Sequence, residues 1–108
     1  MGAGFCGISM IQHTVSFRLK HPKGSEAEAA FMAALQGLRV LPGVLEFRVL
    51  KQVSPKNDFD YGLSMYFSSQ ETYDGYDAHP THQRFVNEIW LQEVEDFLEI
   101  DYVEHATV

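Results

Sequence analysis

The sequence predicts an α+β fold with the element order βαββαβ, a ferredoxin-like arrangement in which a four-stranded antiparallel sheet carries both helices on one face. Apolar and polar residues alternate in four short segments, which is the period of a strand with one buried face. Two intervening segments repeat apolar residues at helical spacing. Turn-forming residues separate these segments, and 108 residues suffice for one ordinary domain.

The first strand is expected over residues 11–20, and His13 is the polar member of its apolar face. Ser25 and Glu28 then form a capping box, in which a hydroxyl and a carboxylate accept hydrogen bonds from early backbone donors. A helix should therefore follow to about Val40, where a Leu-Pro-Gly run ends it.

Two further alternating segments, residues 45–53 and 59–67, flank a loop of turn formers and predict a hairpin. A short helix should follow. Pro80 cannot donate to a helical ladder but is favoured in a first turn, so we expect a break just before it. A second helix is then predicted from Pro80 to about Asp96, and a last strand over residues 98–104.

The sheet face opposite the helices is expected to carry a mixed set of side chains rather than a strongly polar one. Its members are Thr14, Ser16, Glu46, Arg48, Leu50, Ser64 and Tyr66. Two such sheets packed together would form a dimeric α+β barrel. We therefore expect a homodimer through the sheet face.

Charge and cysteine content limit the classes of partner. The formal net charge is −7, and no Lys or Arg follows Arg84, so binding to nucleic acid or to an anionic membrane is disfavoured. The apolar runs are too short to span a bilayer. Cys6 is the single cysteine, which excludes an internal disulfide and fits a cytoplasmic location. We expect residues 1–9 to be a flexible extension and residues 10–108 to be a single domain.

The most informative segment for function runs from Tyr76 to His82 and places a tyrosine and two histidines around a proline. A position in the first turn of a helix favours the neutral form of His82, which suits removal of a proton next to a carbonyl. Tyr76 would then donate a hydrogen bond to the developing oxygen anion. The alternatives are a locally hydrogen-bonded His82 and a Tyr76 that simply packs in the core.

His79 is expected to cap or bridge the helix break. A metal shared by His79 and His82 is a weak alternative, since Pro80 disrupts their register and no zinc-type spacing is present. His13 is either a pocket residue or a hydrogen-bonded core histidine, and the same choice applies to Tyr61 and to Tyr102. The sequence has no Gly-rich phosphate loop, nucleophile elbow or Cys–His pair, so no cofactor is expected.

Several sequence blocks together resemble the stress-responsive A/B barrel (Dabb) family. The blocks are Ile11-Gln12-His13-Thr14-Val15, Leu41-Pro42-Gly43-Val44, Tyr66-Phe67-Ser68-Ser69, Tyr76-Asp77-Ala78-His79-Pro80-Thr81-His82-Gln83-Arg84-Phe85 and Ile100-Asp101-Tyr102. The resemblance spans residues 10–104 and implies a dimeric α+β barrel.

A more distant resemblance links the chain to one branch of that family, the plant polyketide cyclase olivetolic acid cyclase. It performs an aldol cyclisation in a cavity between sheet and helices. The resemblance implies that His82 is the general base, that Tyr76 assists it, and that His13 matches a histidine of the first strand. Tyr61 stands where the cyclase has a further pocket histidine, so the substrate and the reaction are not implied.

Three functions remain open at this point. The first is a cofactor-independent, cyclase- or isomerase-like enzyme, or a binder, of a small hydrophobic carbonyl compound, with His82 as base and His13, Tyr61 and His79 near the ligand. The second is a non-catalytic homodimeric stress or interaction protein, in which the Tyr76–His82 segment is a structural joint. A cofactor-independent monooxygenase ranks third, because no distinctive signature of that chemistry is present.

Overall fold

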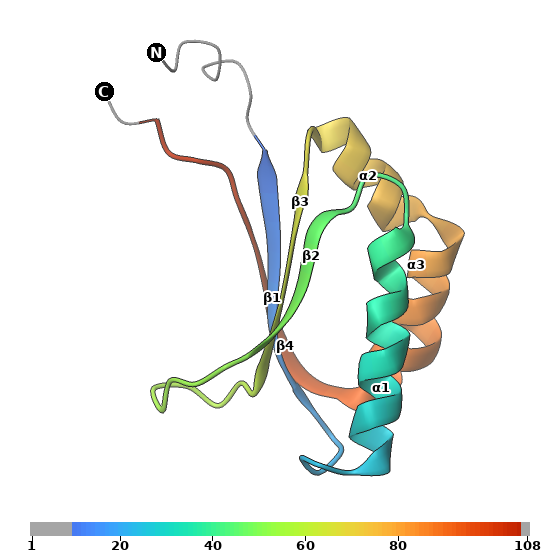
Figure 1. Cartoon of the computed structure of the whole chain (residues 1–108), viewed down its shortest axis with the longest axis vertical. Helices are drawn as coiled ribbons and strands as arrows, with labels where there is room; N and C mark the ends of the chain where they lie inside the picture. Colours follow the sequence, from blue (N-terminus) through green and yellow to red (C-terminus); the bar gives the residue numbers. More distant parts are fainter. Residues whose placement is uncertain (1–9, 107–108) are drawn as a thin grey trace.

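The computed structural model describes residues 10–106 and confirms the predicted fold. Four antiparallel strands form one sheet in the order β2-β3-β1-β4, and the helices all lie on one of its faces (Figure 1). The extension expected over residues 1–9 lies outside the described residues. Within residues 10–106, no helix has the length and apolar character needed to cross a membrane.

The central strand β1 (Ile11–Leu19) pairs with β3 (Tyr61–Phe67) on one side and with β4 (Val94–Tyr102) on the other. Burial alternates along β1 residue by residue, as the sequence predicts. Its register fixes the position of the site, because His13 lies opposite Asp101 of β4. The remaining strand, β2 (Leu45–Lys51), is the other edge of the sheet.

Helix α1 (Glu26–Gln36) begins as the capping signal predicts and continues as a 3-10 turn, η2 (Gly37–Val40), to the expected end. The Ser25 hydroxyl accepts a hydrogen bond from the backbone N–H of Glu28 at 3.1 Å. The Glu28 carboxylate accepts from the N–H of Gly24 at 2.9 Å, one residue before the position of the usual capping box.

The second helical region is divided into α2 (Gln70–Ala78), α3 (Pro80–Phe85), the π-helical turn η3 (Val86–Trp90) and the short α4 (Leu91–Glu93). The break falls at His79, whose backbone is extended with φ −63° and ψ 135°. This is the conformation that a following proline imposes.

The predicted end of the last helix and start of the last strand are wrong. The helix ends at Glu93 rather than near Asp96, and β4 begins at Val94 rather than at Leu98. Pairing with β1 sets this boundary, because Val94 lies opposite Leu19, with a register irregularity at that point. Tertiary pairing therefore overrides the helical spacing of the sequence.

The hairpin strands are shorter than predicted. Strand β2 ends at Lys51 rather than Val53, and β3 begins at Tyr61 rather than Phe59. Between them the Gln52 amide donates to the Asn57 side chain at 3.0 Å and to the Phe59 carbonyl at 2.6 Å. These side-chain hydrogen bonds satisfy polar groups that backbone pairing would satisfy if β2 and β3 were longer.

The hydrophobic core lies between the sheet and the helices. Its most deeply buried large side chains are Phe17, Phe31, Phe67, Leu35 and Met65. Full burial of each such side chain contributes roughly 1.5–3 kcal/mol relative to exposure. This layer of aromatic and aliphatic side chains holds the sheet and the helices that carry the polar residues of the candidate site.

The outer face of the sheet is more apolar than expected. The register places Leu98, Ile100 and Tyr102 of β4 opposite the outward-facing residues of β1. Their exposed fractions are 49%, 38% and 51%, respectively. Tyr102 is therefore neither buried nor near a pocket between sheet and helices. None of the helices in residues 10–106 covers this face (Figure 1).

Candidate functional site

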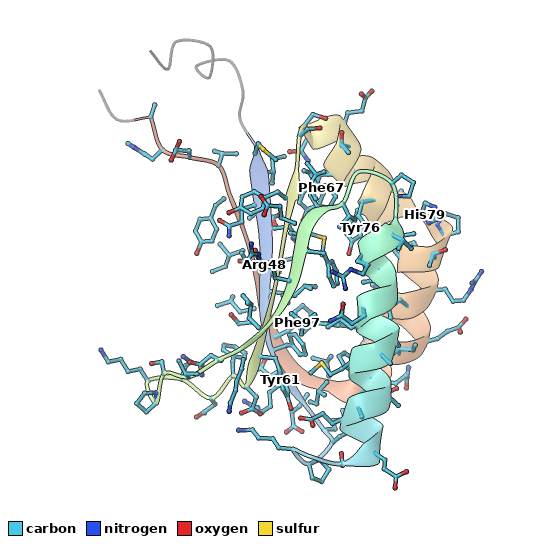
Figure 2. All side chains as sticks on the ribbon, in the orientation of Figure 1. Arg48, Tyr61, Phe67, Tyr76, His79 and Phe97 are labelled. Carbon is cyan, nitrogen blue, oxygen red and sulfur yellow. The ribbon has the colours of Figure 1, made fainter. Side chains whose placement is uncertain are left out.

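A cavity of about 210 Å³ lies between the sheet and the helices. Three of the predicted site residues line it: His13 from β1, Tyr76 from α2 and His82 from α3. Figure 2 shows Tyr76 between the sheet and the helices. The rest of the lining is mainly apolar and includes Val15, Leu35, Leu38, Leu63, Phe85, Val86, Trp90, Leu91 and Phe97, with Asp77, Gln83 and Glu99 as polar members.

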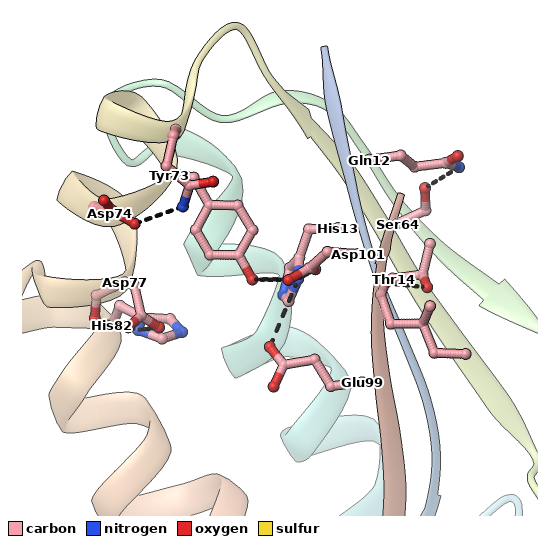
Figure 3. Close-up of polar contacts among 12 residues, drawn as sticks. Gln12, His13, Thr14, Ser64, Tyr73, Asp74, Asp77, His82, Glu99 and Asp101 are labelled. Atoms are coloured by element: carbon pink, nitrogen blue, oxygen red, sulfur yellow. Dashed lines mark hydrogen bonds and ion pairs between the residues drawn. The ribbon is translucent and has the colours of Figure 1, made fainter. Parts of the chain in front are cut away.

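His82 is held in one tautomer by the helix break. Its Nδ1 lies 2.9 Å from the carbonyl oxygen of Asp77 (Figure 3). A carbonyl oxygen can only accept, so Nδ1 carries the hydrogen and the neutral ring has a free lone pair on Nε2. Among residues 10–106 no polar side-chain atom is both fully buried and unpartnered. Nε2, which has no partner there, is therefore accessible.

Tyr76 is a buried phenol whose hydroxyl is free to donate. Only 2% of the residue is exposed, and its ring centroid lies 4.4 Å from that of His82. Burial, reinforced by the negative charges of Asp77 and Glu99, raises the pKa of the Tyr76 hydroxyl above its ordinary value. The hydroxyl therefore keeps its proton in the neutral range.

His13 belongs to a polar cluster that spans three elements. Its Nδ1 lies 2.6 Å from Asp101 Oδ1 and 2.9 Å from the Tyr73 hydroxyl (Figure 3). The Tyr73 hydroxyl donates to Asp101 Oδ2 at 2.8 Å, and Glu99 Oε2 lies 3.6 Å from His13 Nδ1. Burial and the bond to Asp101 raise the pKa of Tyr73. The cluster joins β1, α2 and β4 around an otherwise buried imidazole.

Tyr73, Glu99 and Asp101 are site residues that the sequence reasoning missed. The available signal was strand alternation, which places Glu99 and Asp101 on the same face of β4 as Phe97. The one metal-like group in residues 10–106 is His13, Glu99 and Asp101, whose ligand atoms lie within 4.8 Å of one another. In the structure His13 Nδ1 is hydrogen-bonded to Asp101 Oδ1, Asp101 Oδ2 accepts from Tyr73, and Glu99 Oε2 lies 3.6 Å from His13 Nδ1.

The structure does not bring Tyr61 to this cavity. Tyr61 lies towards the opposite end of the sheet from Tyr76 (Figure 2), where its hydroxyl donates to the Glu28 carboxylate of α1. That bond, followed by the one from the Gly24 N–H, lowers the pKa of Glu28. Tyr61 lines a separate hollow of about 400 Å³, together with Lys23 and Asp60 among others.

His79 has a structural position. Its Nδ1 accepts a hydrogen bond from the backbone N–H of Thr81 at 3.1 Å, so it is the N-cap of α3. Figure 2 shows the side chain on the outer side of the helices, and it does not line the cavity. The Nδ1 atoms of His79 and His82 both bond to backbone groups, so a metal shared by these two residues would have to bind their Nε2 atoms.

The chain is similar in sequence to a known family and to known proteins. A family model described as the Stress responsive A/B Barrel Domain (Dabb) matches residues 11–104. A stress-response A/B barrel domain-containing protein of Arabidopsis thaliana is 29% identical over 96 residues. The match covers 87% of this chain and 36% of that protein, so the chain spans little more than a third of the relative.

Solved structures show the same architecture. A Dabb family protein of Mesorhizobium loti with a ferredoxin-like fold is 46% identical, with a TM-score of 0.88, over 91% of this chain and 99% of that one. A dimeric ferredoxin-like protein of unknown function from Jannaschia sp. is 27% identical, with a TM-score of 0.66, over 86% and 97%. Hydroxynitrile lyase from Passiflora edulis is 17% identical, with a TM-score of 0.79, over 92% and 96%, a likeness of fold alone.

Proposed function

The chain belongs to the stress-responsive A/B barrel (Dabb) family, and from that premise we propose that it is a cofactor-independent enzyme of the cyclase or isomerase type. Its substrate is a small, largely apolar carbonyl compound bound in the cavity between sheet and helices. His82 is the general base, and Tyr76 is the hydrogen-bond donor to the carbonyl oxygen.

One observation carries this proposal: a histidine with a free Nε2 lies beside a protonated phenol in the same apolar cavity. The Nδ1–H of His82 is bonded to the Asp77 carbonyl, which leaves Nε2 as the basic atom. The Tyr76 ring lies 4.4 Å away, centroid to centroid, so base and donor can contact one ligand. The mainly apolar walls of the cavity favour an apolar ligand.

The chemistry that follows is removal of a proton from the carbon next to the carbonyl. The C–H bond breaks as its proton moves to His82 Nε2, and the electron pair becomes the C=C bond of an enolate. The former carbonyl electrons move to the oxygen, which accepts a hydrogen bond from Tyr76. The enolate can then be protonated again or attack a second carbonyl carbon, and these outcomes correspond to isomerisation and aldol cyclisation.

The proposal is tested by deuterium exchange at the activated carbon of phenylacetone in D₂O, followed by NMR. The wild type should accelerate the exchange. His82→Ala should reduce the enzymatic rate by about a hundredfold or more, and Tyr76→Phe by about the same order, while binding persists. His105→Gln, which changes an exposed histidine outside the cavity, is the matched control. Equal exchange by wild type and His82→Ala would rule out His82 as the base.

The alternative is a non-catalytic homodimeric stress or interaction protein. An observation that favours it is the apolar outer face of the sheet, with Leu45 and Leu50 on β2 and the outward residues of β4. Binding of phenylacetone without exchange would support a ligand-binding protein. Absence of both binding and exchange would support the interaction protein.

We also propose that the protein is a homodimer through this face and acts in the cytoplasm. Relatives of the same fold are described as dimeric. Large exposed apolar patches on soluble proteins mark interaction sites.

The proposed cytoplasmic location rests on the single cysteine of the sequence, which leaves no internal disulfide.

A further inference from the structure

We propose that His13 is a second acid–base group of the cavity and that Asp101 and Tyr73 are the residues that position it. The inference rests on the proposed function and deepens it. His13 and His82 line the same cavity on different elements, β1 and α3. Tyr76 lies close to both, with its ring centroid 6.4 Å from that of His13 and 4.4 Å from that of His82. A ligand in contact with Tyr76 is therefore within reach of both imidazoles.

The hydrogen bonds around His13 determine which nitrogen faces the ligand. Each oxygen of the Asp101 carboxylate accepts one bond: Oδ2 from the Tyr73 hydroxyl at 2.8 Å, and Oδ1 from His13 Nδ1 at 2.6 Å. A carboxylate accepts only, so Nδ1 carries a hydrogen. The remaining nitrogen, Nε2, has no hydrogen-bond partner in residues 10–106. Because no fully buried polar side-chain atom in those residues lacks a partner, Nε2 is not fully buried. Nε2 is therefore the atom that His13 presents to the cavity.

The pair of carboxylates suits His13 to the role of acid. Asp101 and Glu99 lie 2.6 Å and 3.6 Å from Nδ1, so they balance the positive charge of a protonated ring. Carboxylates that accept from the Nδ1–H of a histidine fix its tautomer and its orientation in other acid–base sites. Among residues 10–106 no carboxylate is as close to His82, whose nearest is Asp77 Oδ1 at 4.0 Å from Nδ1. The two histidines thus have different environments within one cavity.

The step that results is an enolisation in which one histidine removes a proton from the carbon and the other protonates the oxygen. His82 Nε2 takes the proton from the carbon, and the electron pair moves through the C=C bond to the oxygen. The Nε2–H bond of protonated His13 breaks as the enol O–H bond forms, which leaves neutral His13 and protonated His82. Return of the proton from the oxygen to His13, and of a proton from His82 to the carbon, restores both. The substrate class is therefore an apolar ketone that reacts through its neutral enol.

The test uses the full-length protein and the phenylacetone exchange assay with three variants. His13→Gln keeps a group that can bond to Asp101 but cannot transfer a proton, and should lower kcat by about a hundredfold with little change in KM. Asp101→Asn should lower kcat about tenfold or more and, in side-chain ¹⁵N NMR spectra of the neutral ring, move His13 towards the Nε2–H tautomer. Asp96→Asn, the same change on the other face of β4, should leave kcat and the tautomer unchanged.

The outcomes separate this inference from the proposed function. Exchange that depends on His82 but is unaffected by His13→Gln would overturn the role of His13 and leave the function standing. A His13 ring that keeps its Nδ1–H tautomer and full kcat in Asp101→Asn would overturn the positioning role. Absence of exchange in the wild type would overturn the proposed function, and this inference with it.

Discussion

Tyr76 has two roles at the scale of a single residue, since it packs in the core and presents its hydroxyl to the cavity. Its ring contacts Phe67 at a centroid distance of 5.0 Å and His82 at 4.4 Å. A phenol that is buried in this way resists ionisation, which is why its pKa is raised. The burial that keeps the Tyr76 hydroxyl protonated therefore also makes the fold sensitive to alkali.

Stability should fall as the pH rises above the ordinary tyrosine value. Below pH 10.0 neither state of Tyr76 is ionised, so the contribution of this group to folding is complete. Above it the unfolded tyrosine loses its proton while folded Tyr76 keeps it, so the free energy of unfolding falls by about 1.4 kcal/mol per pH unit. Urea titrations of wild type and Tyr76→Phe test this. The substitution should remove that increment from the slope, and equal slopes would contradict it.

Some residues of the candidate site could be identified from the sequence, and others could not. That His82 and Tyr76 lie at one cavity could be predicted, because a proline-marked helix break draws attention to them and helical spacing sets their positions. Tyr73 and Asp101 could not, because their importance depends on the register between β1 and β4. Tyr61 was placed in the pocket by resemblance, whereas the structure pairs it with Glu28 at the other end of the sheet.

At the scale of elements, the turn before β2 fits closely against α2. Gly43 has φ +86°, a left-handed conformation that favours glycine, and a Cβ there would overlap the Thr72 methyl group. The Thr72 hydroxyl lies 2.7 Å from the hydroxyl of Ser69, the N-cap of α2. The turn thus holds the start of the helix that carries Tyr73 and Tyr76.

Two glycine substitutions separate backbone strain from crowding. Gly24→Ala introduces backbone strain without crowding, because φ is +82° and no atom lies within 4 Å of the added Cβ. It should therefore lower the free energy of unfolding by about 1–2 kcal/mol. Gly43→Ala should cost about 1–3 kcal/mol more because of the overlap with Thr72. Thr72→Ser, which removes the methyl group and keeps the hydroxyl, should abolish that excess. Equal thermal destabilisation by both alanine variants would contradict the packing argument.

Element types were predictable and boundaries were not. Local signals such as the Ser25 cap and Pro80 set the helix starts, and the structure confirms both. The end of the last helix depends on pairing between Val94 and Leu19, which are far apart in the sequence. Residues of the last strand alternate clearly, but alternation does not reveal which face is buried. Apolar Leu98 and Ile100 in fact face outwards.

At the scale of the whole molecule, helices cover one face of the sheet, and within residues 10–106 the other face is open (Figure 1). The open face carries exposed apolar side chains from both edge strands, β2 and β4. A second copy of this chain is the occupant that we propose for it. The cavity lies on the opposite side of the sheet, so dimer formation would support the site without blocking it.

Charge introduced on the open face should separate the protomers. Ile100→Lys places an ammonium group where 38% of the residue is exposed in the single chain, and the cost of burying that charge should convert the dimer to a monomer. Val53→Lys is the control, because Val53 is 83% exposed in the hairpin loop. Light scattering at micromolar concentration measures the mass. A wild type that is already monomeric would refute the interface.

The most direct test of the central claim is a side-chain ¹⁵N NMR spectrum of His82 at mildly alkaline pH, recorded with and without phenylacetone. The account predicts a neutral ring with its hydrogen on Nδ1, bonded to the Asp77 carbonyl, and an Nε2 resonance that moves when the ketone binds. A hydrogen on Nε2, or an Nε2 resonance that the ketone leaves unchanged, would contradict the assignment of His82 as the base of this cavity.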